Sequence, residues 1–308
     1  MTGDPRAAAP EPQTRPPWAA DPAEAPTGVH VVPPGRLRRV GARPALGDYV
    51  ASLWQRRFFL WADALAKVAG STRETRLGAG WLVLRPMLDG LAYFLLFGLL
   101  MSSSRGVPNF LGYLIVGVFL FSFTTQCVTR GATSVLDGRN LVRAFAFPRA
   151  ALPIAIVLRE VLTYLLTLAA MVTLVLVLPP AEVLTWRVVL IPAVLLLQTI
   201  FCAGLALLLA RVTTTLPDMR LIIGLGMRFW LYGSAVFFSY EQFVGHPTLL
   251  ALLRANPMFM VLDMVRDCLL YGRTPQASMW WALSAWALGA LAVGFVVFWR
   301  AEESYGRP

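Results

Sequence analysis

The sequence predicts an all-α integral membrane protein with six membrane-spanning helices. Six long apolar runs fill most of the chain after residue 80, and three of them hold no charged residue over the length of a span. Hydrophobic residues make up 57% of the 308 residues, charged residues only 14%, and the mean hydropathy is +0.63. A bilayer core of about 30 Å takes about 20 apolar residues of helix. A helix also satisfies its own backbone polar groups there, so helices are expected rather than strands.

The first 80 residues differ from the rest of the chain. Residues 1–45 hold nearly half of the 22 prolines, several arginines and few large apolar side chains. This composition is typical of a disordered tail, which we place in the cytoplasm. Residues 46–80 carry leucine, tryptophan and phenylalanine near helical spacing, with charged residues in the same stretch. They indicate an amphipathic helix at the membrane interface. A small soluble helical hairpin is the alternative.

Residues 81–308 are predicted to form the six-span membrane domain. Three runs carry charges: Asp89 in the first, Arg159 and Glu160 in the third, and Arg228 in the fifth. Each run is still long enough to span a bilayer. In chain order the predicted spans are Pro86–Ser104, Phe110–Thr129, Ala151–Leu178, Val188–Ala210, Leu221–Tyr240 and Trp280–Trp299.

The distribution of positive charge orients these spans. The formal net charge is +10, and most of the 27 lysines and arginines lie in residues 1–80, 130–150, 211–220 and 300–308. The other connections hold only Arg105, Arg187, Arg254, Arg266 and Arg273. Basic residues concentrate on the cytoplasmic side of membrane proteins, so both termini are predicted to lie inside. The same distribution argues against a nucleic-acid surface, and no nucleic-acid partner is expected.

Two connections between the spans have structure of their own. Residues 130–150 form a short basic connection with a turn at Asp137-Gly138, and Asn140–Phe147 could form a short helix that ends at Pro148. Residues 241–279 are long and rather apolar, and Pro247 and Pro257 divide them. Two short helices that re-enter the outer leaflet fit this segment better than a solvated loop.

The chain lacks the residues for most chemistry. Its single lysine, Lys67, precedes Val68, whereas a phosphate-binding P-loop needs Gly-Lys-Ser/Thr. The two histidines, His30 and His246, do not stand in a metal-ligand spacing with cysteines or carboxylates. We therefore expect no metal, no cofactor and no catalytic residue in this chain, and no enzymatic activity. A membrane-embedded glycosyl or acyl transferase would need polar groups converging at one depth.

The charged and aromatic residues inside the predicted spans have two readings each. Arg228 faces protein, water or an anionic substrate, because burial of an arginine near the bilayer centre costs about 2.5–3.5 kcal/mol. Aromatic pairs at helical spacing either pack the core or line a pore; the pairs are Tyr93 and Phe97, Phe119 and Phe123, and Trp230 and Phe237. The flat faces of aromatic rings would let a sugar chain slide past without a deep binding minimum, as conduction requires.

From residue 46 onward the sequence resembles the permease subunits of ABC-type polysaccharide and teichoic-acid exporters, the type-2 ABC exporter class. The first match is TRETRLGAGWLVLRPMLDGLAYFLLFG at 72–98, and the second is NLVRAFAFPRAALP at 140–153. The third is Arg211 to Asp218, followed by Ser234. The fourth is Asn256-Pro257, followed by Arg266. Their order and spacing carry the resemblance.

The resemblance implies a homodimer in the bacterial plasma membrane, with two copies of a cytoplasmic ATPase subunit that binds ATP and Mg²⁺. The cargo would be a polyprenyl-pyrophosphate-linked glycan: a cell-wall glycan, an O-antigen-like polymer or a teichoic acid. By the same resemblance the interfacial helix before the first span acts as a gate among the membrane lipids.

The resemblance also assigns roles to residues. Those expected to couple to the ATPase are Asn140, Leu141, Arg143, Phe147, Pro148, Arg149 and Asp218. The gate or lipid-pyrophosphate contact would use Arg76, Leu77, Gly78, Arg85 and Arg228, since arginine suits bidentate phosphate binding. The aromatics of the glycan channel would be Tyr93, Phe97, Phe119, Phe123, Trp230 and Phe237.

Three other functions stay open at this point. The nearest is a drug- or lipid-exporting permease of the same class, with a smaller cavity. A membrane-embedded transferase and a structural scaffold subunit are the others, and the sequence offers little for either.

Overall fold

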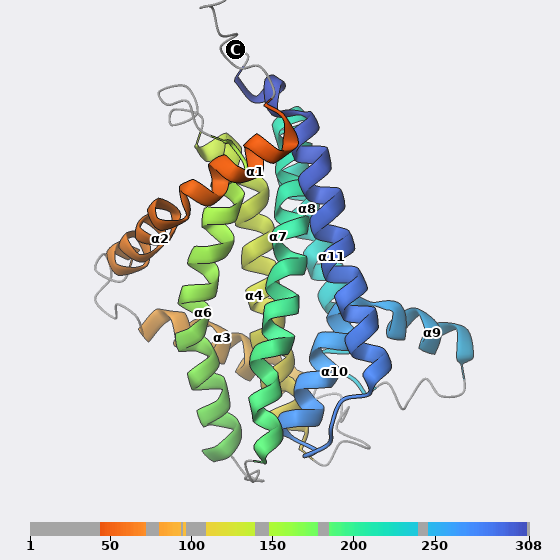
Figure 1. Cartoon of the computed structure of the whole chain (residues 1–308). Helices are drawn as coiled ribbons and strands as arrows, with labels where there is room; N and C mark the ends of the chain where they lie inside the picture. Colours follow the sequence, from red (N-terminus) through yellow and green to blue (C-terminus); the bar gives the residue numbers. More distant parts are fainter. Residues whose placement is uncertain are drawn as a thin grey trace, which may run out of the picture. The chain divides into compact units, whose positions relative to one another are not determined.

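The computed structural model describes residues 44–71, 80–93, 95–96, 109–138, 148–177, 185–239 and 246–306. Every regular element within these ranges is a helix, which confirms the predicted all-α class. Figure 1 shows the helices of the bundle, coloured along the chain.

Four long helices match four of the predicted spans. They are α4 (Phe110–Asp137), α6 (Ala151–Val177), α7 (Ile191–Thr215), which continues the short 3-10 helix η4 (Trp186–Leu190), and α11 (Ala277–Arg300). With η4 counted into α7, they have 28, 27, 30 and 24 residues, and each is apolar enough to cross a bilayer. The turn expected at Asp137-Gly138 is present, because α4 ends at Asp137 and Gly138 follows as its cap.

The two predicted spans that contain a charge near glycine, Pro86–Ser104 and Leu221–Tyr240, have a different form. The helix α3 begins earlier, at Gly80, and ends at Tyr93, while all residues beyond Leu96 in this run lie outside the described ranges. The helix α8 (Met219–Tyr232) stops well before Tyr240, and the chain turns through residues 233–239. Among the described residues, four helices can therefore span a bilayer, or five if the bent pair α9–α10 is one crossing.

Short helices occupy the remaining segments, as their prolines and charges predict. Helices α9 (Pro247–Ala255) and α10 (Pro257–Leu269) each begin at a proline and are bent by 85° against each other. The interfacial segment forms two helices rather than the one expected, α1 (Leu46–Gln55) and α2 (Arg57–Ser71), separated at Arg56. Both are amphipathic: Tyr49 and Ala64 are buried, whereas Trp54 and Phe58 are exposed.

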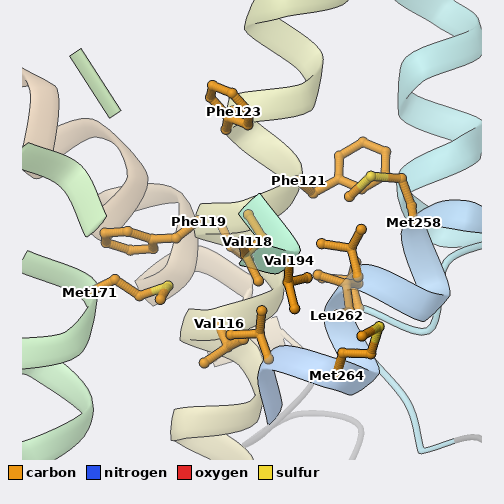
Figure 2. Packing of buried hydrophobic residues seen from close by; sticks show 14 of the residues in the cluster. Val116, Val118, Phe119, Phe121, Phe123, Met171, Val194, Met258, Leu262 and Met264 are labelled. Carbon is orange, nitrogen blue, oxygen red and sulfur yellow. The ribbon is translucent and has the colours of Figure 1, made fainter. Parts of the chain in front are cut away.

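Helix α4 forms the centre of the bundle. In its most apolar window 78% of the residues are buried, against 22–33% in α6, α7 and α11, whose outer faces are open in a single chain. Figure 1 shows α4 among α6, α7 and α10, and Figure 2 shows the core around its Val116 and Phe119. In this core, Met171 of α6, Val194 of α7 and Leu262 of α10 are fully buried.

Helices α7 and α11 approach each other most closely at two glycines. A Cβ atom on Gly294 would overlap the backbone of Gly204, and one on Gly204 would overlap the backbone of Ala290. Small residues at such a crossing allow the backbones to touch, which is how helices gain packing energy when lipid replaces water.

The two ends of the bundle carry different segments. At one end, which we call the Tyr49 end, Tyr49 packs with the start of α6 and the last turns of α7 and α11, through Ala150, Ala210 and Phe298. The opposite end, which we call the Arg266 end, contains α10 and the turn that follows α8 (Figure 1).

Candidate functional site

A cavity of about 670 Å³ opens between α3, α4, α6 and α8. Its walls combine aromatic rings, hydroxyl and amide groups, and charged side chains. The aromatic residues are Trp81, Tyr93, Phe121, Phe123 and Tyr164, the neutral polar residues are Ser122, Thr125, Gln126, Thr129, Thr163 and Thr167, and the charged residues are Asp89, Arg130, Glu160 and Arg228.

Two polar stripes face this cavity from neighbouring helices. On α4 the stripe contains Ser122, Thr125, Gln126 and Thr129, and on α6 it contains Glu160, Thr163, Tyr164 and Thr167. Both follow the spacing i, i+3, i+4, i+7, which places all four residues of each stripe on one face of its helix. The sequence therefore builds the cavity by giving one polar face to each of two otherwise apolar helices.

The hydroxyl groups of the α4 stripe are turned so that they can accept hydrogen bonds from the cavity. Ser122 donates to the Phe119 carbonyl at 2.8 Å, Thr125 to the Phe121 carbonyl at 3.0 Å, and Thr129 to the Thr125 carbonyl at 2.7 Å. A hydroxyl that donates to its own helix keeps lone pairs available as acceptors. A ligand rich in O–H donors suits this wall.

An ion pair joins the two stripes at one end. The Arg130 Nη1 atom lies 2.6 Å from Oε1 of Glu160, and the side chains are 48% and 3% exposed. The neighbouring residues Arg159 and Glu160 do not form this contact with each other; Glu160 bridges to α4, as expected for adjacent residues of one helix. The guanidinium compensates the charge of the buried Glu160 carboxylate. Because the Arg130 side chain is half exposed, the guanidinium also stays accessible from the cavity.

Aromatic rings form the rest of the wall. Phe123 and Tyr164 lie with centroids 4.6 Å apart at 32°, and Tyr93 packs on Phe237 at 4.6 Å and 51°. The buried hydroxyl of Tyr164 has no hydrogen-bond partner among the described residues. This part of the wall is flat and largely apolar, and it is complementary in character to the hydroxyl stripe.

The structure distributes the predicted channel aromatics over several places. Tyr93 and Phe123 line the cavity, together with the predicted Arg228. Phe119 is fully buried and points toward Met171 (Figure 2), and Phe237 is buried behind Tyr93. Phe97 lies outside the described residues.

Trp230 lines a second, apolar cavity of about 520 Å³ beside α9 and α11. Its ring contacts Phe121 and Phe201 edge-on, with centroids 5.8 and 6.1 Å apart. Phe121, which Trp230 contacts, also lines the first cavity.

The residues predicted to couple to an ATPase or to a gate fall partly outside the description. Pro148 is buried and Arg149 is partly buried at the Tyr49 end, and Asp218 is exposed in the turn between α7 and α8. The side chain of Arg85, in α3, is not described. The other predicted positions lie outside the described ranges: Asn140, Leu141, Arg143, Phe147, Arg76, Leu77 and Gly78.

The break after α8 is held by a second polar cluster, which centres on Arg266 of α10. Its guanidinium donates to the carbonyls of Ala235 at 3.0 Å, Tyr113 at 3.1 Å and Val236 at 3.4 Å, and it lies 3.3 Å from the ring centre of Tyr113. The Tyr113 hydroxyl donates to the Ala235 and Phe238 carbonyls. Backbone carbonyls freed by a broken helix need such donors inside a membrane protein.

Asn256, between α9 and α10, completes this cluster. Its Oδ1 atom accepts hydrogen bonds from Trp230 Nε1 and from the Met258 N–H, both at 3.0 Å. Its Nδ2 atom donates to Ser234 Oγ at 2.9 Å and to the Gly233 carbonyl at 3.3 Å. Ser234, Asn256-Pro257 and Arg266, which are distant in the sequence, thus lie together at the break. The helix that was expected to continue over 233–240 ends instead at Tyr232.

The polar stripes were missed in the sequence, although a signal was present. The predictions above rest on charged and aromatic residues, whereas the two stripes consist mostly of serine, threonine and glutamine within apolar runs. Counting neutral polar residues at helical spacing would have found both stripes. Their juxtaposition across two helices would still have required the fold.

The sequence is similar to those of known proteins. Residues 66–270 match the family model described as ABC-2 type transporter. An O-antigen export system permease protein RfbA of Myxococcus xanthus is 28% identical over 256 residues, which are 83% of this chain and 94% of that protein. Two proteins of the same name from Klebsiella pneumoniae are 25% and 23% identical over 170 residues, 55% of this chain and 64% of theirs. Because the family model covers about two thirds of its length, the chain belongs to the ABC-2 type transporter family.

Proposed function

We propose that this chain is the permease subunit of an ATP-driven exporter, and that its cargo is a polysaccharide. The observation that carries the proposal is the cavity between α3, α4, α6 and α8, whose wall combines two polar stripes with aromatic rings. The relatives named as O-antigen export permeases support the same class of cargo.

The chemistry of the wall suits sugars better than apolar cargo. Sugar hydroxyls would donate to the acceptors of Ser122, Thr125 and Thr129, while the C–H faces of the rings would stack on Tyr93 and Phe123. Each contact is weak and repeated, which a moving polymer requires. A drug- or lipid-exporting permease would gain nothing from a row of hydroxyl acceptors.

The proposed orientation places the Tyr49 end, both termini and the tail of residues 1–45 in the cytoplasm of the bacterial inner membrane. The concentration of arginines in the segments at that end supports it. In this proposal the full chain has six spans, with α3 and α8 belonging to the first and fifth, and α9–α10 re-enters from the outer side. The helices α1 and α2 would lie at the cytoplasmic interface as the gate.

We further propose a homodimer that carries two ATPase subunits, which bind ATP and Mg²⁺. One face of α8 is apolar and exposed in the single chain, through Leu221, Leu225 and Phe229, and a Cβ on Gly224 or Gly226 would meet open space. Such a face supports close packing of a second copy. The ATPase would contact residues 139–149, which connect Gly138 at the end of α4 to Ala150 before α6, and the turn at Asp218.

The lipid carrier of the glycan would contact arginines. Arg228 lines the cavity, and the proposal adds Arg76 and Arg85, because a guanidinium binds phosphate oxygens in pairs. The polyprenyl chain itself would remain among the membrane lipids.

The test compares two substitutions of the same chemistry in cells that depend on this chain. Replacing Tyr93 and Phe123 by leucine removes two rings from the cavity, whereas replacing the exposed Trp281 of α11 by leucine removes a ring that does not line it. We expect the cavity variant to accumulate polyprenyl-linked glycan on the cytoplasmic side at an unchanged protein level. The Trp281→Leu variant should export normally.

The rival functions give different results in the same experiment. Unchanged surface glycan together with lost efflux of an apolar dye would instead indicate a drug or lipid exporter. Turnover of a lipid-linked sugar donor by the purified chain without any ATPase would indicate a transferase.

A further inference from the structure

Three segments that are distant in the sequence meet at the side chain of Glu302. The Tyr49 hydroxyl of α1 donates to Glu302 Oε2 at 2.8 Å, and the backbone N–H of Arg149 donates to Glu302 Oε1 at 3.1 Å. The N–H of Ala150 donates in turn to the Tyr49 oxygen at 3.0 Å, and the Arg149 guanidinium donates to the Glu302 carbonyl. We call Tyr49, Arg149, Ala150 and Glu302 the Glu302 junction.

The junction is buried, although it lies at the end of the bundle. Tyr49 is 1% exposed, Ala150 0% and Glu302 6%. The ends of α4, α7 and α11 surround it with apolar side chains, including Leu207 and Phe298. A buried network in which each donor has an acceptor holds its members rigidly, because breaking one bond leaves a polar group without a partner.

The segments that it joins have different surroundings. Arg149 ends the connection 139–149, which the proposed function assigns to the ATPase. Tyr49 belongs to α1, which leads to α2 and its exposed aromatic residues Phe58 and Phe59. Glu302 begins the short 3-10 helix η6 (Glu302–Gly306), which follows α11 after Ala301, and Gly294 of α11 lies tightly against Gly204 of α7. Among the described residues, the junction therefore joins the end of the connection 139–149 to α1 by hydrogen bonds.

We propose that the Glu302 junction transmits movement of the ATPase-facing connection to α1 and α2, with Glu302 and Tyr49 as positioning residues for export. This proposal rests on the proposed function, because it needs an ATPase partner. The carboxylate suits the task because each of its oxygens serves a different segment, Oε2 for α1 and Oε1 for the connection. A glutamine keeps the size of the side chain but puts an NH2 group in place of one oxygen, so in this geometry it cannot accept from both segments.

The experiment follows α2 in the complete complex with the ATPase subunit, reconstituted in lipid. The three cysteines of the chain are buried, so a spin label on Ala66→Cys, at an exposed position of α2, reports this helix alone. We expect ATP with vanadate to change the label spectrum in the otherwise native protein. Glu302→Gln and Tyr49→Phe should reduce that change about fivefold or more, a typical size for coupling between sites.

Two further measurements separate transmission from damage to the fold. ATP hydrolysis by the complex should stay near the native rate in both variants, because the connection can still bind the ATPase. The double variant should lose no more than either single one, since both remove the same interaction. Asp63→Asn is the matched control: it removes the exposed pair of Asp63 with Lys67 at 2.8 Å on α2, and it should leave the response unchanged.

Two results would overturn the proposal: a native response of the label in Glu302→Gln and Tyr49→Phe, or a loss of response in exact proportion to a loss of ATP hydrolysis. Failure of the native chain to bind an ATPase would reject the proposed function itself. The native sample therefore tests the function, and the comparison of variants tests the junction.

Discussion

At the scale of single residues, Arg266 shows how the protein stabilises a break in a membrane helix. Its side chain is 1% exposed, and its donors reach carbonyls of two segments, residue 113 and residues 235–236. Its planar, forked guanidinium can serve several acceptors at once, which the single ammonium of lysine cannot do in the same geometry.

We predict that Arg266→Lys lowers the thermal stability of the detergent-solubilised protein. The charge remains, but at least one carbonyl of the break loses its donor, and bonds to charged groups contribute about 1.5–3 kcal/mol each. The control is Arg254→Lys on the exposed part of α9, which should melt as the native protein does. Equal melting of both variants in a fluorescence-based thermal scan would show that the cluster does not stabilise the break.

The ion pair of Arg130 and Glu160 gives an asymmetric prediction. Arg130→Gln leaves a carboxylate that is 3% exposed without its partner, whereas Glu160→Gln leaves an arginine that is 48% exposed and can reach water. We expect Arg130→Gln to lower the melting temperature more than Glu160→Gln, since the penalty for an unpaired charge grows with its burial. The reverse order would mean that the cavity hydrates Glu160.

At the scale of elements, the sequence predicted those helices that are defined by their own apolar pattern. The uncharged run Phe110–Thr129 lies within α4, and Ala151–Leu178 corresponds to α6 within a residue, because apolar composition alone determines a span. The run Leu221–Tyr240 looked equally apolar, yet its helix ends at Tyr232. The donors that stabilise this break come from Tyr113, Asn256 and Arg266, and no local pattern shows that they will meet.

The same distinction applies to the candidate site. The sequence indicated Tyr93, Phe123 and Arg228, and all three line the cavity. It gave no reason to separate Phe119 from Phe123, which share a helix face by spacing. Both are buried, and only the tertiary packing places Phe123 at the cavity and Phe119 beside Met171. The coupling and gate assignments stay predictions, since most of those residues lie outside the described ranges.

The crossing of α7 and α11 predicts opposite effects for two glycines of one helix. Gly294→Ala places a methyl group against the Gly204 carbonyl, and overpacking of this kind costs about 1–3 kcal/mol. Gly289→Ala adds a methyl group where nothing lies within 4 Å, and it should be neutral or slightly stabilising. Thermal melting of the two variants in the same detergent tests this, and similar losses in both would exclude a tight crossing at Gly294.

The burial of the Glu302 carboxyl group, just after α11, predicts that the stability of the protein depends on pH. Burial raises the pKa of this carboxyl group above its usual value, although hydrogen bonds from Arg149 and Tyr49 act in the opposite direction. A carboxyl whose pKa is raised on folding contributes stability fully below its unfolded pKa of about 4.3, and this contribution is lost as the pH rises through the folded pKa.

We therefore expect the melting temperature of the native protein, relative to Glu302→Gln, to rise as the pH is lowered from about 7 to about 4. The nearby Tyr49 and Tyr305 do not titrate in this range, because burial raises the pKa of both hydroxyls further. A constant difference between native protein and variant across that range would contradict the raised pKa.

At the scale of the whole molecule, the proposed orientation predicts which positions a membrane-impermeant thiol reagent can reach. Single cysteines at Ala66 and Glu303 should react only after the cells are opened, whereas a cysteine at Arg273, after the re-entrant pair, should react in intact cells. The three natural cysteines are buried and should stay silent. Labelling of Ala66→Cys and Arg273→Cys from the same side would reject the topology.

The spacing of the polar stripes has a consequence for how a polymer would move past them. Acceptors on α4 recur at Ser122, Thr125 and Thr129, about one per helical turn of 5.4 Å. A chain of repeating units that advances by one turn exchanges each hydrogen bond for an equivalent one, so its energy is nearly the same before and after the step. The helix pitch would thus set the length of each step of the polymer. The direction of its movement would have to come from the ATPase alone.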